Sequence, residues 1–414
     1  MLSTSPTKLK KTDNTYLFPS QSHDSQWKTR LHAFHHSQKF STRLLEAQRV
    51  RWNNELLFYN GGLASRAYAF NDDLYNFFSK DVINFMNLHK CKETSKVWLN
   101  LSGSYKVTDS SIISFVSSIC RYLPHLQELW INVVYLRITD KALERIGSEI
   151  SKNLLHLQNL RLRFEGCDEI TDQGLSILSK DVCRNLLGLK HFYFVVQQCL
   201  EISDASLQVL LVDMKKYLKQ LKSLTFTLSK SEKITEKTVL DLANLFDEDR
   251  AQIESLYIAF TECGIITNQI FDLLAQNIAK YLVNLKSLTL EFQVCEELTD
   301  KGFEVLAQEL SKLENLRDLD LNFNGCHRIS DRSLKALEVP IQSLKNLKTF
   351  KVSVAGPNRV TLRGLDKLAD DISENQKDLK SLSLDFNGNF KMSQESLQRV
   401  NKKLGYIYDF TLFN

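Results

Sequence analysis

The sequence contains no run of about 20 consecutive apolar residues, the length that a membrane-spanning helix needs. Its opening stretch, MLSTSPTKLKKTDNTYLFPS, includes no apolar segment, so we expect no secretory signal peptide. This stretch is rich in serine and threonine and poor in acidic residues, which leaves a mitochondrial transit peptide open, although it lacks arginine and a clear amphipathic pattern. The eight cysteines form no CxxC pair. Free thiols in a reducing compartment fit this pattern, so the sequence predicts a cytoplasmic protein.

The sequence also lacks the short motifs of the common enzyme classes. A phosphate-binding loop, HExxH, GxSxG and the protein-kinase signatures are all absent. His32, His35 and His36, in LHAFHH, could begin a zinc site, but no cysteine lies near them and their spacing matches no known site type. A solvated helix face is the better interpretation of these histidines. We therefore expect no enzyme, and we predict no catalytic, cofactor-binding or metal-binding residue and no small-molecule substrate.

The composition and charge describe a near-neutral chain with a basic N-terminal segment. The 414 residues are 43% hydrophobic and 25% charged, which is ordinary for a globular protein and enough to bury a large core. Residues 1–50 carry eight lysines and arginines against three acidic residues, a net charge of +5, which leaves −1 of the total +4 for the rest of the chain. Residues 1–39 have few apolar side chains and predict a basic flexible arm. Either this arm binds an acidic partner surface or it is a solvated tail.

One position, apolar in nine of ten copies, recurs along the chain at intervals of 31 or 32 positions. This anchor position is occupied by Thr94, Leu126, Leu157, Leu189, Leu221, Ile253, Leu285, Leu316, Leu347 and Leu379. Apolar residues follow each anchor by three, five and seven positions. Because alternate side chains of a strand point to the same side, this spacing predicts ten β-strands, each with one buried side.

Two further columns follow the predicted strands, a cysteine in five copies and Thr-Asp or Ser-Asp in six. The cysteines that lie ten positions after an anchor are Cys167, Cys199, Cys263, Cys295 and Cys326. A small buried thiol fits the point where the chain leaves the strand, so we predict unpaired, unreactive cysteines there. Thr-Asp or Ser-Asp comes next, as in VTD at 107 and ITD at 138 and 170. Threonine or serine before an amphipathic segment is a helix N-cap, and the acidic residue favours the positive end of the helix dipole, so both have structural roles.

Each copy thus consists of a strand, a turn, a capped helix and a loop. Ten copies run from residue 94 to about 404, and YIYDFTLFN supplies a closing half-repeat. The L-x-x-L-x-L strand, the cysteine and the I-T-D-x-x-L helix start resemble leucine-rich repeats. The motif is nearest to the cysteine-containing subfamily and the repeat length to the ribonuclease-inhibitor type. The resemblance implies an α/β solenoid, a horseshoe with a concave parallel sheet and convex helices, that usually binds a protein on the sheet.

Residues 40–93 precede the repeat domain, residues 94–414. FSTRLLEAQRVRWNNELLFY, at 40–59, and FNDDLYNFFSKDVINFMNLHK, at 70–90, carry apolar residues at helix-like spacing. Because a solenoid needs a cap over its first repeat, we predict that 40–93 is a helical N-terminal cap. An F-box would indicate a ubiquitin-ligase adaptor, but its Leu-Pro start and later aromatic pattern are missing here.

The residues two, four and six positions after each anchor should point to the concave surface. These residues are aromatic and basic in the first repeats, small and hydroxylated in the middle, and acidic in the last repeats. Tryptophans on neighbouring exposed strands cost solubility unless a partner covers them, and aromatic and arginine side chains dominate interface energetics. The predicted partner-binding residues are Lys96, Trp98, Trp130, Arg161, Arg163, Tyr193 and Tyr257.

Three functions are compatible with this surface. We favour a non-enzymatic scaffold or adaptor that binds a protein partner on the concave face. The alternative is a structural subunit of a large cytoskeletal or ciliary assembly, anchored by the basic arm. RNA binding is the third, because aromatic and arginine side chains can stack on bases. The repeats are near neutral and their acidic end would repel phosphate, so we expect no nucleic-acid partner. Because no apolar run is long enough to span a membrane, we also expect no membrane partner.

Overall fold

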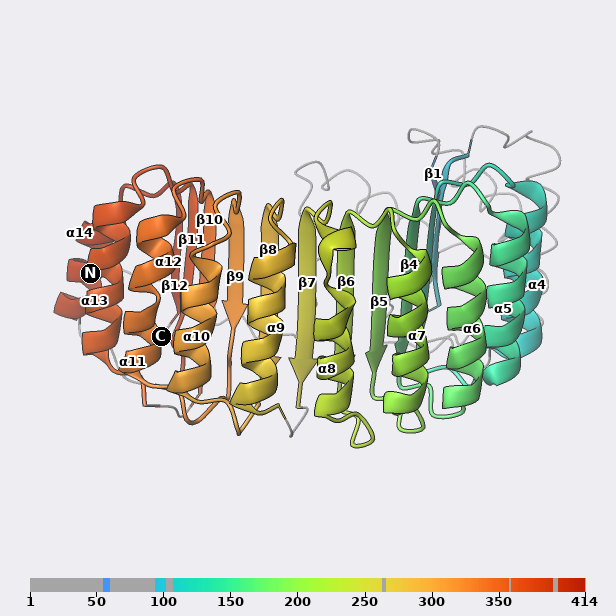
Figure 1. The fold of residues 1–414 in the computed structure, drawn as a ribbon, viewed down its shortest axis with the longest axis horizontal. Coiled ribbons are helices and arrows are strands. Elements are labelled where there is room, and N and C mark those ends of the chain that lie inside the picture. Colours follow the sequence, from blue (N-terminus) through green and yellow to red (C-terminus); the bar gives the residue numbers. More distant parts are fainter. Residues whose placement is uncertain are drawn as a thin grey trace, which may run out of the picture. The chain divides into compact units, whose positions relative to one another are not determined.

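The repeated apolar columns form one parallel sheet with helices against one of its faces (Figure 1). A computed structural model describes residues 55–59, by backbone only, and 94–101, 107–262, 266–356, 359–389 and 394–413. All of these belong to one compact unit, Trp52–Asn414. The predicted arm, the three histidines of LHAFHH and Cys263 lie outside the described residues. Within the described part, no helix is long and apolar enough to cross a membrane.

Twelve strands of the described residues pair side by side in sequence order, every neighbouring pair parallel. The strands are β1 Glu55–Tyr59, β2 Lys96–Asn100, β3 Glu128–Val134, β4 Asn159–Glu165, β5 His191–Gln197, β6 Ser223–Ser229, β7 Ser255–Thr261, β8 Ser287–Gln293, β9 Asp318–Asn322, β10 Thr349–Ser353, β11 Ser381–Asp385 and β12 Asp409–Phe413. The ten predicted strands and the closing half-repeat are confirmed, and each repeat strand begins two positions after its anchor.

A helix follows most strands and packs against the helices of its neighbouring repeats. The helices are α4 Asp109–Tyr122, α5 Asp140–Asn153, α6 Asp172–Asn185, α7 Asp204–Tyr217, α8 Glu236–Leu245, α9 Asn268–Tyr281, α10 Asp300–Leu310, α11 Asp331–Ala336, α12 Glu338–Ser343, α13 Leu362–Asn375 and α14 Gln394–Leu404, with the 3-10 turn η3 Glu248–Arg250 after α8. This arrangement is the predicted α/β solenoid with a parallel sheet.

The position of strand β1 contradicts part of the predicted helical N-terminal cap. It lies inside the stretch 40–59 that the apolar spacing predicts to be helical, and that prediction is wrong for its five residues. Glu55 pairs with Lys96, 41 positions later, so β1 adds a parallel strand ahead of the first recognised repeat. Its sequence ELLFY is rich in large apolar and aromatic side chains, which pack well on a pleated sheet. The rest of 40–93 lies outside the described residues.

The core lies between the sheet and the helices. Alternate strand residues are buried, as in β4, where Leu160, Leu162 and Phe164 are at most 1% exposed. Phenylalanine rings continue across the repeats: Phe260 and Phe292 stack with centroids 5.7 Å apart, and Phe292 and Phe323 with centroids 6.1 Å apart. Each such ring or leucine contributes about 1.5–3 kcal/mol by leaving water. The core therefore runs continuously from repeat to repeat.

A left-handed residue precedes the cysteine position in the repeats. The residues with φ between 52° and 110° at this turn are Tyr135, Gly166, Gln198, Lys230, Glu262, Val294, Gly325, Gly356 and Gly388. The following cysteine turns inward; Cys326, for example, is 0% exposed and donates its thiol to the Phe292 carbonyl at 3.0 Å. Cys167, Cys199, Cys295 and Cys326 are all buried and form no disulfide, as predicted.

The threonine or serine of most helix starts is confirmed as the N-cap. Thr171 Oγ1, for instance, accepts from Gln173 N at 3.2 Å. The acidic residue that follows does more than the dipole argument predicts, because it bonds to the next repeat. Asp140 accepts from Thr171 N at 2.8 Å and from Thr171 Oγ1 at 2.6 Å. Equivalent pairs recur along the helix starts and tie each repeat to its successor.

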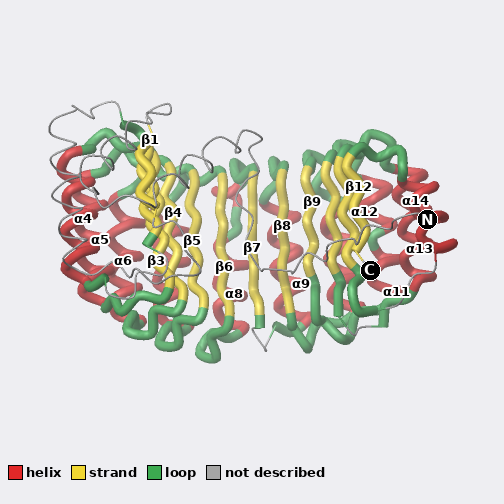
Figure 2. Tube along the Cα trace, turned by 180° about the vertical axis from the view of Figure 1, so that it is seen from behind, coloured by secondary structure: helices red, strands yellow, loops and turns green. Residues whose placement is uncertain are grey.

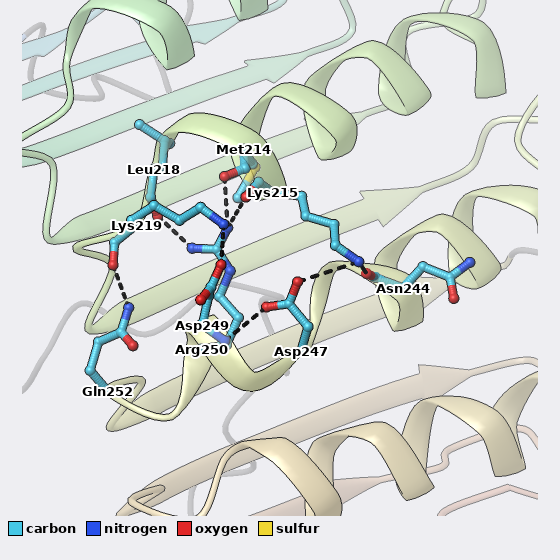
Figure 3. Close-up of polar contacts among 9 residues, drawn as sticks. All are labelled: Met214, Lys215, Leu218, Lys219, Asn244, Asp247, Asp249, Arg250 and Gln252. Carbon is cyan, nitrogen blue, oxygen red and sulfur yellow. Dashed lines mark hydrogen bonds and ion pairs between the residues drawn. The ribbon is translucent and has the colours of Figure 1, made fainter.

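The repeat that contains α8 departs from the others (Figure 3). Arg250 stands where neighbouring repeats have Leu218 and Leu282, and it is 0% exposed. Its guanidinium donates to the Met214, Lys215 and Leu218 carbonyls at 2.8, 2.9 and 2.5 Å, so it caps the end of α7. Ion pairs of Lys215 with Asp247, at 3.4 Å, and of Lys219 with Asp249, at 2.5 Å, flank it.

Candidate functional site on the helix-free face of the sheet

The helices cover one face of the sheet, and the other face is turned toward the viewer in Figure 2. We call this second face the helix-free face. Its side chains are those two, four and six positions after each anchor, because they alternate with the buried ones along every strand. All seven predicted partner-binding residues lie on this face.

Trp98, Trp130 and Arg161 form one cluster at the N-terminal end of this face. They occupy directly opposed positions on β2, β3 and β4. The two indole rings meet edge to face, with centroids 5.3 Å apart and planes inclined by 66°. The Arg161 guanidinium carbon lies 5.6 Å from the centroid of the Trp130 ring. Aromatic pairs prefer this geometry, and a cation over an indole gains further attraction, so these contacts hold the three side chains in one arrangement.

The two arginines of the site are already paired with carboxylates. Arg161 lies 3.6 Å from Glu128, whose side chain is 8% exposed. Arg163, two residues further along β4, forms a short ion pair with Glu165 and donates to Gln197 Oε1 at 3.1 Å. These contacts orient the guanidinium groups and neutralise much of their charge.

The remaining predicted residues divide into two groups. Tyr193 lies opposite Arg161 on β5 and continues the row, while Lys96 lies opposite Glu128 at the start of β2. Tyr257 stands apart, because Thr225 of β6 lies between it and Tyr193. We therefore define the aromatic–arginine strip as Trp98, Trp130, Arg161 and Tyr193.

The C-terminal half of the same face is acidic. Burial raises the pKa of Glu291, and the nearby Asp320 carboxylate raises it further. Burial likewise raises the pKa of Asp320, although Lys351 lies 3.6 Å away and opposes this shift. These two carboxylates outnumber the one lysine beside them, so this part of the face carries a net negative charge that the strip lacks.

The sequence did not single out Glu128 and Glu165, the carboxylates that hold the arginines. Each belongs to the repeat positions that face away from the helices, and each lies on the same strand as an aromatic or arginine residue of the site. Reading those columns for opposite charges on adjacent strands would have found the Glu128–Arg161 pair. Among the described residues, no group of three histidines, cysteines or carboxylates could hold a metal ion.

Comparison with known proteins returns structures only, since no family model and no curated protein matches the chain. One similar structure is a chain of the Rad7–Elc1 complex from yeast, 16% identical, with 93% of this chain and 78% of that chain covered and a TM-score of 0.48. Another is a chain of the TLR13–ssRNA13 complex, 16% identical, with 80% of this chain and 51% of that chain covered and a TM-score of 0.34. From its own architecture of parallel strands and capped helices that repeat in sequence order, the chain has the fold of a leucine-rich-repeat solenoid.

Proposed function

We propose that this protein is a non-enzymatic interaction scaffold and that a protein partner binds the helix-free face over the aromatic–arginine strip. The observation that carries the proposal is the Trp98–Trp130–Arg161 cluster, in which two indoles and a guanidinium lie in contact on neighbouring strands. Tryptophan, tyrosine and arginine are the residues most enriched among interface hot spots. A partner that meets a preorganised cluster loses less entropy on binding.

The charge pairing at the strip favours a protein over a nucleic acid. Arg161 and Arg163 both form ion pairs with carboxylates, so neither guanidinium is an uncompensated cation that a phosphate backbone could bind. The acidic residues near Glu291 and Asp320 add repulsion toward phosphate. A partner with an apolar or aromatic segment over the strip and basic side chains over the acidic half would complement both ends. The alternative, a structural subunit of a cytoskeletal or ciliary assembly, gains no support from the comparisons.

Affinity capture with the full chain as bait tests the proposal. Trp130→Ala and Arg161→Ala baits should lose a protein that the wild-type bait retains. Lys351→Ala is the matched control, because Lys351 occupies the same strand position in the acidic half of the face, and removing a cation there should not weaken a partner that is basic at that end. Circular dichroism of each variant checks that the repeats stay folded. Partners retained equally by all three variants would move the interface away from the strip.

A further inference from the structure

A cluster of cations lies outside the helix-free face. It occupies the segments that connect strands to helices in the C-terminal repeats. Arg328 lies in the loop before α11, Arg332 in the first turn of α11, Arg359 in the loop before α13 and Lys301 in the first turn of α10. Together with Thr299 and Asp300 they line a surface hollow of about 350 Å³. Short parallel bridges, Thr299 to Arg328 and Ser330 to Arg359, hold these loops side by side.

The charges of this hollow are only partly compensated. Arg328 pairs with Glu297 at 3.0 Å and Arg332 with Glu304 at 2.9 Å, and both arginine side chains remain more than half exposed. Among the described residues, Lys301 and Arg359 form no ion pair, although Lys301 acts on the Asp272 carboxyl, where it opposes the rise in pKa that burial causes. The remaining acid, Asp300, has its oxygens occupied by Ser330 N, Ser330 Oγ and Ser333 Oγ at 2.6–2.8 Å. The lining holds four cations against one carboxylate, so the hollow presents positive charge and N–H donors to solvent.

The repeat fold does not require these cations. Arg328 and Arg359 stand two positions before the N-cap of their helices, where earlier repeats have Glu169 and Glu201. A carboxylate is thus tolerated at this position without loss of the fold. Two neighbouring repeats that both carry arginine there place two guanidinium groups on adjacent loops.

We propose that this hollow binds a phosphoryl group carried on a serine or threonine side chain of a protein partner. Guanidinium groups offer a planar fork of donors that matches phosphate oxygens, and a phosphorylated side chain carries a charge of about −1.5 to −2 at pH 7. The lining contains no large apolar side chain, and its volume is near the lower end of ligand sites, about 300 Å³. A compact dianion fits both features, and the open rim leaves room for the peptide that carries it.

Fluorescence anisotropy with the full chain tests this site. The probes are a labelled alanine peptide with a central phosphoserine, the same peptide with serine, and inorganic phosphate as competitor, all at physiological salt. We expect the phosphopeptide to bind at least tenfold more tightly than the serine peptide and inorganic phosphate to compete only weakly. Equal binding of the two peptides, or competition by inorganic phosphate at the affinity of the phosphopeptide, would overturn the proposal.

Variants locate the binding and separate it from general attraction. Arg328→Gln and Arg359→Gln should each weaken phosphopeptide binding about tenfold, because each removes a charged donor. Glu297→Gln should strengthen it a few-fold, since Arg328 then has no competing carboxylate. Arg137→Gln is the matched control, with the same repeat position before the N-cap Thr139 of α5, and should change nothing.

The site is independent of the aromatic–arginine strip. Trp130→Ala should therefore leave phosphopeptide binding unchanged even where it abolishes capture of a partner. A loss in Arg137→Gln equal to that in Arg328→Gln would mean diffuse attraction, and a loss in Trp130→Ala would place the phosphopeptide on the strip. Tighter binding of a single-stranded oligonucleotide than of the phosphopeptide would indicate a nucleic acid ligand. Each of these results would overturn the proposal.

Discussion

Asp172, the first residue of α6, accepts hydrogen bonds from Ser203 of the next repeat, from its backbone N at 2.8 Å and from its Oγ at 2.5 Å. Ser206 Oγ donates to the same carboxylate at 2.5 Å. Ser203 in turn caps α7 by accepting from Ala205 N at 3.2 Å. One carboxylate thus fixes the start of two helices, and stacking and capping are coupled.

Removing this carboxylate should destabilise the repeat stack. We expect Asp172→Ala to lower the free energy of unfolding by about 2 kcal/mol, because the donors of Ser203 lose their acceptor at a partly buried position. Asp172→Asn should cost less, since Asn268 already serves in this role and accepts from Thr299 N at 3.0 Å. Urea unfolding followed by circular dichroism measures both. Equal losses in the two variants would show that charge, rather than hydrogen bonding, dominates.

The same carboxylates predict acid sensitivity. Burial alone would raise the pKa of Asp172 and Asp204, but hydrogen bonds from the next repeat outweigh it and lower both values. The folded state then binds these protons less readily than the unfolded state. Their contribution to stability is complete above the ordinary aspartate pKa of about 3.9 and is lost as the pH falls through the lowered folded values. Urea midpoints measured between about pH 6 and pH 3 should fall more steeply for the wild type than for an Asp172→Ala, Asp204→Ala double variant.

Arg250 should be replaceable by leucine but not by alanine. The Met214 carbonyl also accepts from the backbone N of Leu218, so the guanidinium supplies its second hydrogen bond, and neighbouring repeats carry leucine at the position of Arg250. Replacing a buried charge by an apolar residue of similar volume is often neutral or stabilising. We expect Arg250→Leu to change the free energy of unfolding by less than about 1 kcal/mol, and Arg250→Ala to cost about 3 kcal/mol through the cavity it leaves. A large loss with leucine would show that the cap on α7 is essential.

Substitutions in the strip should reduce partner affinity without unfolding the chain. Once a partner is purified, Trp130→Ala and Arg161→Ala should each weaken binding by more than about 1 kcal/mol, by isothermal titration calorimetry. Trp130 contacts both Trp98 and Arg161, so the double variant should lose less than the sum of the single losses. Additive losses would indicate that the three side chains act independently.

Neutralising Glu291 should stabilise the protein near neutral pH. A raised pKa means that the folded state resists ionisation of this carboxyl, a cost that is present above the raised value and relieved as the pH falls. Glu291→Gln should therefore raise the thermal unfolding midpoint at pH 7 and have little effect near pH 4, by scanning calorimetry. A Glu291→Gln variant that melts lower at pH 7 would contradict the burial argument.

The repeat pattern alone predicts the period, the strands, the capped helices and the buried cysteines. These features depend on residues within one repeat, and ten copies make each column visible, as with Cys295 and Leu298-Thr299-Asp300. It also placed Trp98, Trp130 and Arg161 in one row, because every strand pairs with its neighbour at the same offset. The spacing missed β1, because this strand lies 41 positions before its partner in β2, a longer interval than the one that separates the recognised repeats.

The side-chain contacts between repeats could not be predicted from the sequence, because they depend on how the folded repeats stack. Glu128 reaches Arg161, Asp140 reaches Thr171 and Arg250 reaches the end of α7, and each contact joins residues about one repeat apart. The cations Lys301, Arg328, Arg332 and Arg359 likewise gather around one hollow although they come from three repeats. The repeat period sets which positions are neighbours, but the lateral stacking of strands and helices sets the distances at which hydrogen bonds and ion pairs form.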